Sequence, residues 1–223
     1  MSDPIEPMID FRTHTREDLI AFVFDHPAAA ESDDQGGPAW FWDDREFDID
    51  PEHHLALVAA MLRDAGSLRT RFSPAQIEQG LWFLFGPAGN EWFGWPLARR
   101  ETSDDRIVDV ITSLHPLYAD LLQHIETDTA TFMLWDLLLE CLLSPDDPDA
   151  ARQRLVRETS LPVLEKILAL DSTECQYAAL HGLGHLRHEA TPEVVRGFLA
   201  SRAGLEPRLR AYAEQVRDGR PVL

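Results

Sequence analysis

Three histidines at helical spacing are the residues of this chain best suited to chemistry. His181, His185 and His188 stand at i, i+4 and i+7. Residues at these intervals share one side of an α-helix, and neutral imidazoles bind Zn²⁺, Ni²⁺ or Fe²⁺. Glu174 falls on the same flank, where its carboxylate can add an oxygen ligand. A bound divalent metal is one interpretation, and solvated or helix-capping histidines are the other. The spacing is not the HExxH of metalloproteases, because a glycine follows the first histidine.

Two carboxylates form a second candidate group. Asp136 and Glu140 stand at i and i+4, and they are the only charged residues of the apolar stretch 131–143. Like charges at this spacing repel each other, so we expect them to be solvated or to share a cation. If this stretch and helix 172–188 are neighbours, the carboxylates line the same groove as the histidines. Such a set can hold a metal or supply an acid and a base, and an ion-paired groove wall is the alternative.

The helix that carries the histidines has clear ends and a clear core side. Ser172 predicts its N-cap, and Thr191-Pro192 opens the next helix. Because successive residues turn by about 100°, one side of the helix is apolar. This apolar stripe consists of Cys175, Ala179, Leu183 and Leu186. The histidine flank lies away from the stripe, so we expect the histidines outside the core.

Local start and stop signals divide the chain into a series of helices, with almost no strand pattern. The predicted starts are at Thr15, Asp50-Pro51, Ser73-Pro74, Ser103, Thr131, Pro148, Ser172, Thr191-Pro192 and Pro207. Gly66 predicts the end of one helix, and Pro116 and Pro162 predict kinks in two others, the second of which is kinked or split. Residues 27–50 and 87–102 are expected to be irregular.

The stretch Ser160–Arg187 resembles a HEAT repeat of the armadillo-like α-solenoid class. A proline-kinked first helix, a short turn and then CQYAALHGLGHL are similar to the HEAT pattern, although no Asp-Val-Arg precedes the alanines. The resemblance implies a right-handed α–α superhelix used mainly for protein binding, and it carries over no catalytic residues. We therefore expect one all-α domain over 1–223. Residues 1–102 are expected to be irregular, aromatic and acidic with some helices, and residues 103–223 to consist of HEAT-like pairs.

The net charge of −19 is unevenly distributed. Residues 1–151 hold 30 acidic and 9 basic residues, a balance of −21, whereas residues 152–223 hold 9 acidic and 11 basic residues, a balance of +2. A negative field repels phosphate backbones, so we do not expect nucleic-acid binding. It attracts a basic protein surface. The alternative is that the acidity only keeps the protein soluble.

Acidic residues and tryptophans of the irregular segments are the candidate partner-binding residues. Tryptophans are common interface anchors, and they also seal the terminal face of a solenoid. The candidates are Asp33, Asp34, Trp40, Trp42, Asp43, Asp44, Trp92 and Trp95. The sequence thus predicts a non-enzymatic module that binds a basic protein, for example an immunity-type protein that neutralises a cationic toxin. A metal-binding protein or metal-dependent enzyme that uses the histidine–carboxylate groove is the alternative.

Other features restrict the compartment and the chemistry. No stretch approaches about 18 uninterrupted apolar residues, and the first residues lack the basic and apolar regions of a signal peptide, so we expect a cytoplasmic protein without a membrane span. Cys141 and Cys175 fall in apolar helical stretches and are expected to be reduced, buried thiols. His53 and His54 open a helix and are expected to face solvent. No cofactor is expected, with a divalent metal as the alternative. A homo-oligomer that packs through the acidic face is a further alternative.

Overall fold

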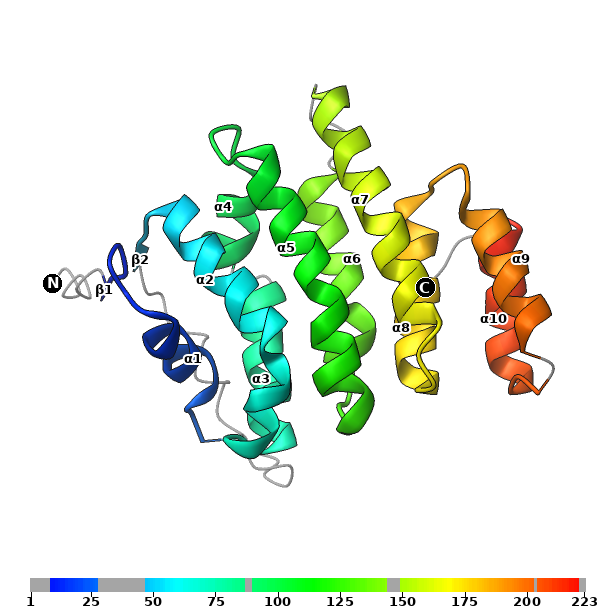
Figure 1. Ribbon diagram of the computed structural model, residues 1–223, viewed down its shortest axis with the longest axis horizontal. Coiled ribbons are helices and arrows are strands. Elements are labelled where there is room, and N and C mark those ends of the chain that lie inside the picture. The colour runs from blue at the N-terminus through cyan, green and yellow to red at the C-terminus, as the bar shows by residue number, and fades with distance from the viewer. Residues whose placement is uncertain (1–8, 28–46, 87–89, 144–148, 203, 221–223) are drawn as a thin grey trace, which may run out of the picture.

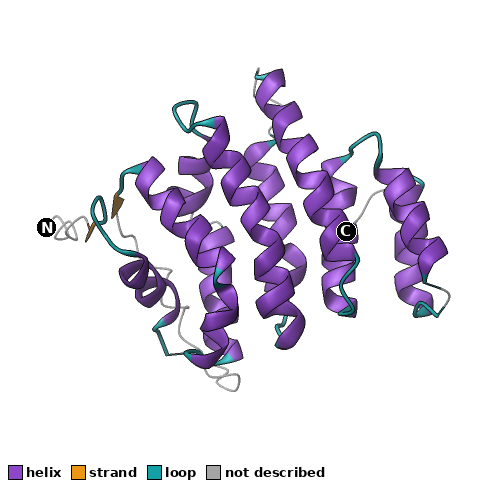
Figure 2. Cartoon of the chain, viewed as in Figure 1, coloured by secondary structure: helices purple, strands orange, loops and turns teal. Residues whose placement is uncertain are grey.

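The computed structural model of the chain is a stack of helices (Figure 1). It describes residues 9–27, 47–86, 90–143, 149–202 and 204–220. The helices are α1 (Arg16–Phe24), α2 (Pro51–Arg63), α3 (Pro74–Phe85), α4 (Trp95–Ala98), α5 (Asp104–Pro116), α6 (Ala130–Leu142), α7 (Ala150–Leu168), α8 (Thr173–Leu186), α9 (Thr191–Ser201) and α10 (Pro207–Arg217). Within these residues the only strands are a short parallel pair, β1 (Ile9–Asp10) and β2 (Phe47–Asp48) (Figure 2). The prediction of an all-α fold is confirmed.

The helices lie in two layers. Helix α5 packs between α2 and α7 in one layer, and α6 packs along α8 in the other. Helix α3 contacts α6, and α10 contacts α8, which extends the second layer in both directions. Helix α7 also packs on α8, and α9 packs on α10, so these consecutive helices form pairs across the layers. The condition for a shared groove, that the helices carrying Asp136 and the histidines are neighbours, is therefore met.

A glycine permits the close approach of α8 to its neighbours. A Cβ atom at Gly182 would lie 2.9 Å from Cβ of Trp135 and 2.7 Å from Cδ2 of Leu164. Both of these side chains are fully buried in the core between the layers. Any larger residue at this position would therefore push α8 away from α6 and α7. The approach brings the residue after Trp135, Asp136, against the face of α8 that carries the histidines.

Carboxylates from the first helices cap the starts of later ones. Glu78 of α3 accepts hydrogen bonds from the backbone N–H groups of residues 128–130 at the start of α6, and from Nε1 of Trp82. Glu52 of α2 accepts from the N–H of Ser103 at the start of α5, at 2.7 Å. The first turn of a helix has N–H groups without intrahelical partners, and these carboxylates accept their hydrogen bonds. Their negative charge also interacts favourably with the positive end of the helix dipole.

Arginines cap helix ends in the second half of the chain. Arg157 of α7 donates to the carbonyl of Leu186 at the end of α8. Arg202 donates to the carbonyls of Ala169 and Leu170, just after α7. Carbonyl groups in the last turn of a helix are similarly unpaired within the helix. These contacts between elements fix how the helix ends lie relative to one another.

Most predicted helix starts are confirmed by their caps. Side chains that accept a hydrogen bond from the first turn are those of Thr15, Asp50, Ser73, Ser103 and Ser172. The structure differs from the sequence prediction at one helix end and in one connecting segment. Helix α2 ends at Arg63, and the chain continues through Gly66 as a 3₁₀ segment, Ala65–Thr70. The segment expected to be irregular after α3 contains a π-turn, Asn90–Gly94, and then α4.

The two internal prolines have different effects. At Pro116, where a kink is predicted, the backbone changes from an α-helix to a π-helical turn, Leu117–Leu121. Helix α7, however, continues through Pro162 without a split. A proline inside a helix costs about 3 kcal/mol. Burial of Leu164 and Ile167 in the following turn contributes about 1.5–3 kcal/mol each, which is enough to keep the helix continuous.

The described helices include none with the length and apolar character needed to cross a membrane. Cys141 and Cys175 form no disulfide bond, and Cys175 is buried whereas Cys141 is half-buried on α6. The prediction of a buried thiol is confirmed for Cys175, and Cys141 is not fully inside the core.

Candidate metal centre

The structure brings Asp136 of α6 together with His181 and His185 of α8. Oδ1 of Asp136 lies 3.2 Å from Nδ1 of His185, and its Oδ2 lies 4.0 Å from Nε2 of His181. One ligand atom from each of the three residues lies within 4.8 Å of the other two. Two atoms bound at about 2.1 Å to one tetrahedral Zn²⁺ ion are about 3.4 Å apart. Small side-chain rotations therefore suffice to bring the three groups onto one ion.

Local helix geometry places the two imidazoles side by side. Ser172 caps α8 by accepting the N–H of Cys175, and the i, i+4 spacing then brings the His181 and His185 ring centroids within 4.5 Å of each other. Phe132, one turn before Asp136 on α6, packs against His181 with a centroid distance of 4.1 Å. The cluster thus has an apolar wall on the α6 side.

His181 is buried and held neutral. The relative exposure of its side chain is 2%, whereas the sequence predicts that the histidine flank lies outside the core. The difference arises because α6 and α10 pack onto α8, and the pattern of residues within one helix does not show this packing. Burial, with a smaller contribution from His185, lowers the pKa of His181 to about 4, despite the opposing effect of Asp136. A neutral imidazole is the form that binds a metal.

Tyr212 of α10 orients the His181 ring. Its Oη lies 2.9 Å from Nδ1 of His181, and burial is the main cause that raises the pKa of Tyr212 to about 12. When Nδ1 carries the ring proton, it donates to this hydroxyl, and the lone pair of Nε2 then faces Asp136. Nε2 of His181 is buried without a hydrogen-bond partner among the described residues. A cation between the imidazole and the carboxylate would satisfy it.

A groove of about 530 Å³ opens beside the cluster. Leu139 of α6 and Leu143, just after α6, supply an apolar section. The polar lining comes from Asp136, Glu140, Gln153, Arg157, His185 and Arg187. The Asp136 and His185 side chains are 26% and 33% exposed, so the cluster is accessible on this side. His181 is buried and does not line the groove. A ligand in the groove would therefore approach through the partly exposed members.

Glu140 and Glu174 lie outside the converging set. Glu140 is exposed on the groove, one turn beyond Asp136, and its carboxylate is not among the three convergent ligand groups. Glu174 is exposed at the start of α8, where its carboxylate accepts a hydrogen bond from Oγ of Ser172 at 3.0 Å. This position is two helical turns from His181, so the shared flank does not bring its carboxylate to the cluster.

The third predicted histidine is also separate from the cluster. Helix α8 ends at Leu186, and Arg187 adopts a left-handed conformation with φ of 49°, which turns the chain away before His188. Nδ1 of His188 accepts the N–H of Ala190 at 3.1 Å, and its Nε2 lies 3.4 Å from Glu158. His188 therefore lies outside the convergent group of Asp136, His181 and His185, and its contact with the N–H of Ala190 agrees with the helix-capping alternative.

The structure places only some of the candidate partner-binding residues. The ones that lie outside the described residues are Asp33, Asp34, Trp40, Trp42, Asp43 and Asp44. Trp92 is fully buried, with ring centroids of Phe11 and Phe22 at 4.9 and 4.6 Å, so it cannot anchor a partner on the surface. Its burial removes a large apolar area from water and fills the aromatic core beside α1. Trp95 is 56% exposed.

A second histidine cluster lies near the start of the chain, and its burial was not predicted. His54 is fully buried rather than solvent-facing, and its Nδ1 lies 3.1 Å from Nε2 of His14. Nδ1 of His14 contacts the carbonyl of Phe11, and Nε2 of His53 donates to the carbonyl of His14. Burial lowers the pKa of His54 to about 3. The signal for burial was its spacing of four from the apolar Val58.

Three comparisons with known proteins yield no relative. No protein-family model matches the chain, and neither the curated proteins nor the solved structures contain a match. The resemblance of Ser160–Arg187 to a HEAT repeat therefore stays a sequence-based expectation.

Proposed function

We propose that this protein binds a divalent transition metal through Asp136, His181 and His185. The observation that supports the proposal is the convergence of the three ligand groups within 4.8 Å around a buried, neutral imidazole. Two imidazoles and one carboxylate suit Zn²⁺ and Fe²⁺ better than Mg²⁺ or Ca²⁺, which prefer oxygen ligands.

The site has the characteristics of a reactive metal centre rather than a structural one. Structural zinc sites are closed by four protein ligands, whereas catalytic sites use three and leave a position for water or substrate. Here two of the three ligands, Asp136 and His185, line a groove of about 530 Å³. A metal with an open position lowers the pKa of its bound water or polarises a bound oxygen. Glu140, which is exposed on the same groove, would exchange protons with such a water.

Metal analysis of untagged protein tests the proposal. Elemental analysis and calorimetric titration with Zn²⁺ should give one ion per chain for the wild type. Asp136→Asn and the His181→Ala/His185→Ala double variant should lose it, whereas His188→Ala, just past the end of α8, should keep it. Circular dichroism checks that each variant is folded. A wild type that takes up no metal, or a folded double variant that binds as well as the wild type, would exclude the site.

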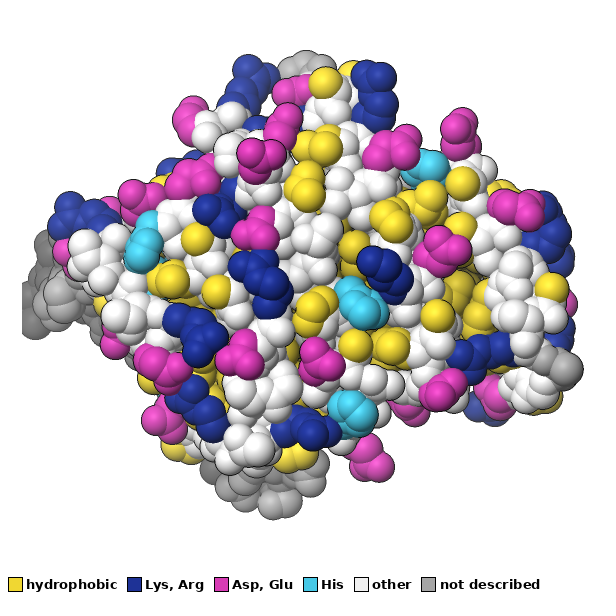
Figure 3. Space-filling view, in the orientation of Figure 1, with side chains coloured by type: hydrophobic (Ala, Val, Ile, Leu, Met, Phe, Trp, Pro, Cys, Tyr) yellow, Lys and Arg dark blue, Asp and Glu magenta, His cyan; other side chains and the backbone are white. Residues whose placement is uncertain are grey.

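A protein-binding module is the second candidate. Trp95 is the one large hydrophobic side chain that is strongly exposed among the described residues, and exposed tryptophans are frequent interface anchors. Acidic and basic side chains are interspersed over the face drawn in Figure 3, so charge-led binding of a basic partner depends on other parts of the acidic chain. An immunity-type role against a cationic toxin is the specific version of this candidate.

Affinity capture from native lysate tests the second candidate, with Trp95→Ala as the variant. A stoichiometric basic protein whose affinity falls with salt would support it. Affinity that is independent of ionic strength would contradict charge-led binding. Light scattering of the purified chain separates this outcome from a homo-oligomer.

A further inference from the structure

The groove beside the candidate metal centre is lined by both acidic and basic side chains. Helix α6 contributes the carboxylates of Asp136 and Glu140, α7 contributes the guanidinium group of Arg157, and the end of α8 contributes that of Arg187. The charges of these two acidic and two basic side chains cancel, so together they give the groove no net charge without an ion. A divalent cation at Asp136 would make it positive by two charges, in a chain whose net charge is −19.

Arg187 is available to a ligand. Within the described residues its side chain forms no hydrogen bond or ion pair, and it is exposed at the rim of the groove. Its φ of 49° places it in the left-handed region, where a residue with a side chain costs roughly 1 kcal/mol relative to glycine. Glycine is the usual residue at this position after a helix. A charged arginine in its place is difficult to explain by folding alone.

Arg157 is held at the same end of the groove. Its guanidinium donates to the carbonyl of Leu186, the residue before Arg187, and this contact fixes its direction. A guanidinium has five N–H donors in a planar fork, so one bond to a carbonyl leaves others free for an oxyanion. The two arginines therefore form a pair of donors next to the partly exposed Asp136 and His185.

We propose that the groove binds a small ligand with a carboxylate or phosphate group, one oxygen of which occupies the open position of the metal. Arg187 and Arg157 bind the remaining oxygens. This inference rests on the proposed metal site, because the ion supplies the net positive charge and the third contact. The volume of about 530 Å³ lies within the roughly 300–1,000 Å³ of small-molecule sites. Charge-assisted bonds from arginine to oxyanions are about twice as strong as neutral hydrogen bonds.

The test uses Zn²⁺-loaded full-length protein and two probes, inorganic phosphate and succinate, in calorimetric titrations. The loaded wild type should bind at least one of them, and the metal-free protein should bind neither. Arg187→Gln should weaken binding about tenfold or more, which corresponds to about 1.4 kcal/mol. Glu140→Gln should strengthen it, because a negative charge is removed from the groove. Arg154→Gln is the matched control, since Arg154 is an exposed arginine on α7 that does not line the groove.

Zinc content is measured in each sample by elemental analysis, which separates the two proposals. A sample without zinc would overturn both. Loaded protein that ignores both anions, or that binds them equally in the Arg157→Gln/Arg187→Gln variant, would overturn the anion site and leave the metal site standing. Anion binding by the zinc-free protein would also overturn the proposed anion site. A preference for phosphate over succinate, or the reverse, identifies which oxyanion the natural ligand carries.

Discussion

Nδ1 of His185 lies 3.2 Å from Oδ1 of Asp136, although the two residues belong to different helices. The contact depends on how closely α8 approaches α6, and this approach depends on the absence of a side chain at Gly182. The candidate metal centre is therefore coupled to the packing of the core. Variants that change the packing, the orientation of the ligands or the caps of α6 should affect the site in different and measurable ways.

A methyl group at Gly182 should disturb both the fold and the site. In Gly182→Ala the new Cβ meets Trp135 and Leu164 at under 3 Å, so we expect a loss of about 2 kcal/mol in the free energy of unfolding, measured with urea. Gly197→Ala is the control, because no atom lies within 4 Å of a Cβ there. That substitution in α9 should stabilise the protein by roughly 0.5–1 kcal/mol. Equal effects of the two variants would refute the packing argument.

Removal of the Tyr212 hydroxyl should weaken metal binding without removing a ligand. Tyr212→Phe leaves Nδ1 of His181 without its partner at 2.9 Å, and loss of such a supporting contact lowers metal affinity about 10–100-fold. Tyr177→Phe is the control, because its hydroxyl bonds to Glu206 and not to a histidine. Competition of zinc between the protein and a chelating dye measures the affinity. If the two variants bind zinc alike, Tyr212 does not orient the ligand.

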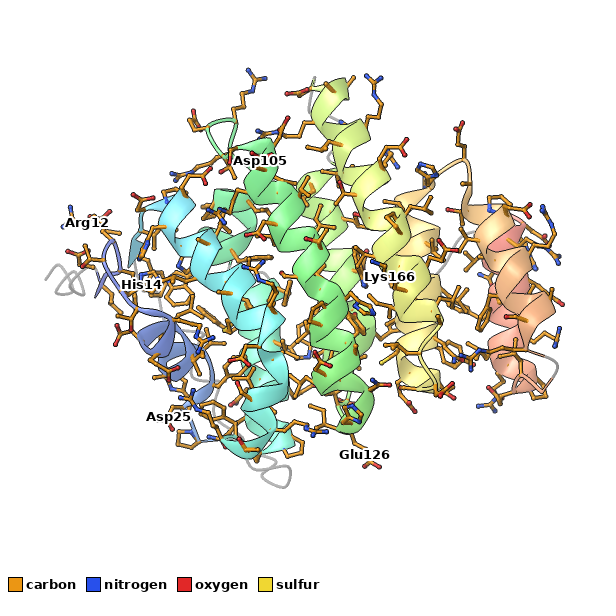
Figure 4. The ribbon with its side chains drawn as sticks, viewed as in Figure 1. Arg12, His14, Asp25, Asp105, Glu126 and Lys166 are labelled. Carbon is orange, nitrogen blue, oxygen red and sulfur yellow. The ribbon has the colours of Figure 1, made fainter. Side chains whose placement is uncertain are left out.

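Loss of the carboxylate that caps α6 should destabilise the fold. Glu78→Gln keeps the shape of the side chain but removes the negative charge at three N–H groups, at 2.9–3.2 Å, and we expect a loss of about 1 kcal/mol. Glu126→Gln, at an exposed glutamate labelled in Figure 4, should change stability by less than about 0.5 kcal/mol. Chemical unfolding of both variants at low ionic strength provides the measurement. An unchanged midpoint for Glu78→Gln would contradict the capping role.

Acid should destabilise the protein through its buried histidines. The pKa of His54 is lowered to about 3 and that of His181 to about 4, both mainly by burial, against about 6.5 in an unfolded chain. Between pH 6.5 and these values the unfolded state binds more protons. Stability present at neutral pH is therefore lost as the pH falls through this window, by about 1.4 kcal/mol per proton and pH unit.

Urea unfolding at pH 7.0, 5.5 and 4.5 checks this dependence. His54→Gln, which removes one of the two groups, should show a shallower decline than the wild type. Many carboxylates also titrate in this pH range, but they are the same in the wild type and the variant. The difference between the two pH profiles therefore reports on His54 alone. The His14 ring, labelled in Figure 4, has its Nε2 3.1 Å from Nδ1 of His54, so the NMR signals of His14 should shift in the variant. Parallel pH profiles would show that His54 is not responsible.

Local sequence signals determined the helices and some features of the site. Caps such as Thr15, Ser103 and Ser172 act within one turn, so the starts of the helices that carry such caps can be identified without tertiary structure. The i, i+4 spacing of His181 and His185 likewise places both imidazoles on one face wherever the helix lies. The neighbouring position of Asp136 and the histidines was only a condition of the shared-groove hypothesis, and the packing of α6 along α8 meets that condition.

Tertiary packing decided which of these residues work together. His181 is buried, and Tyr212 faces it, only because α10 packs against α8, and no pattern within either helix contains that contact. His188 leaves the set because the backbone turns at Arg187, where the sequence has no glycine to mark the end of the helix. Spacing along a helix is set by backbone geometry that repeats at every turn. Burial and ligand convergence depend on the contacts between helices far apart in the chain, which form only when the whole core is assembled.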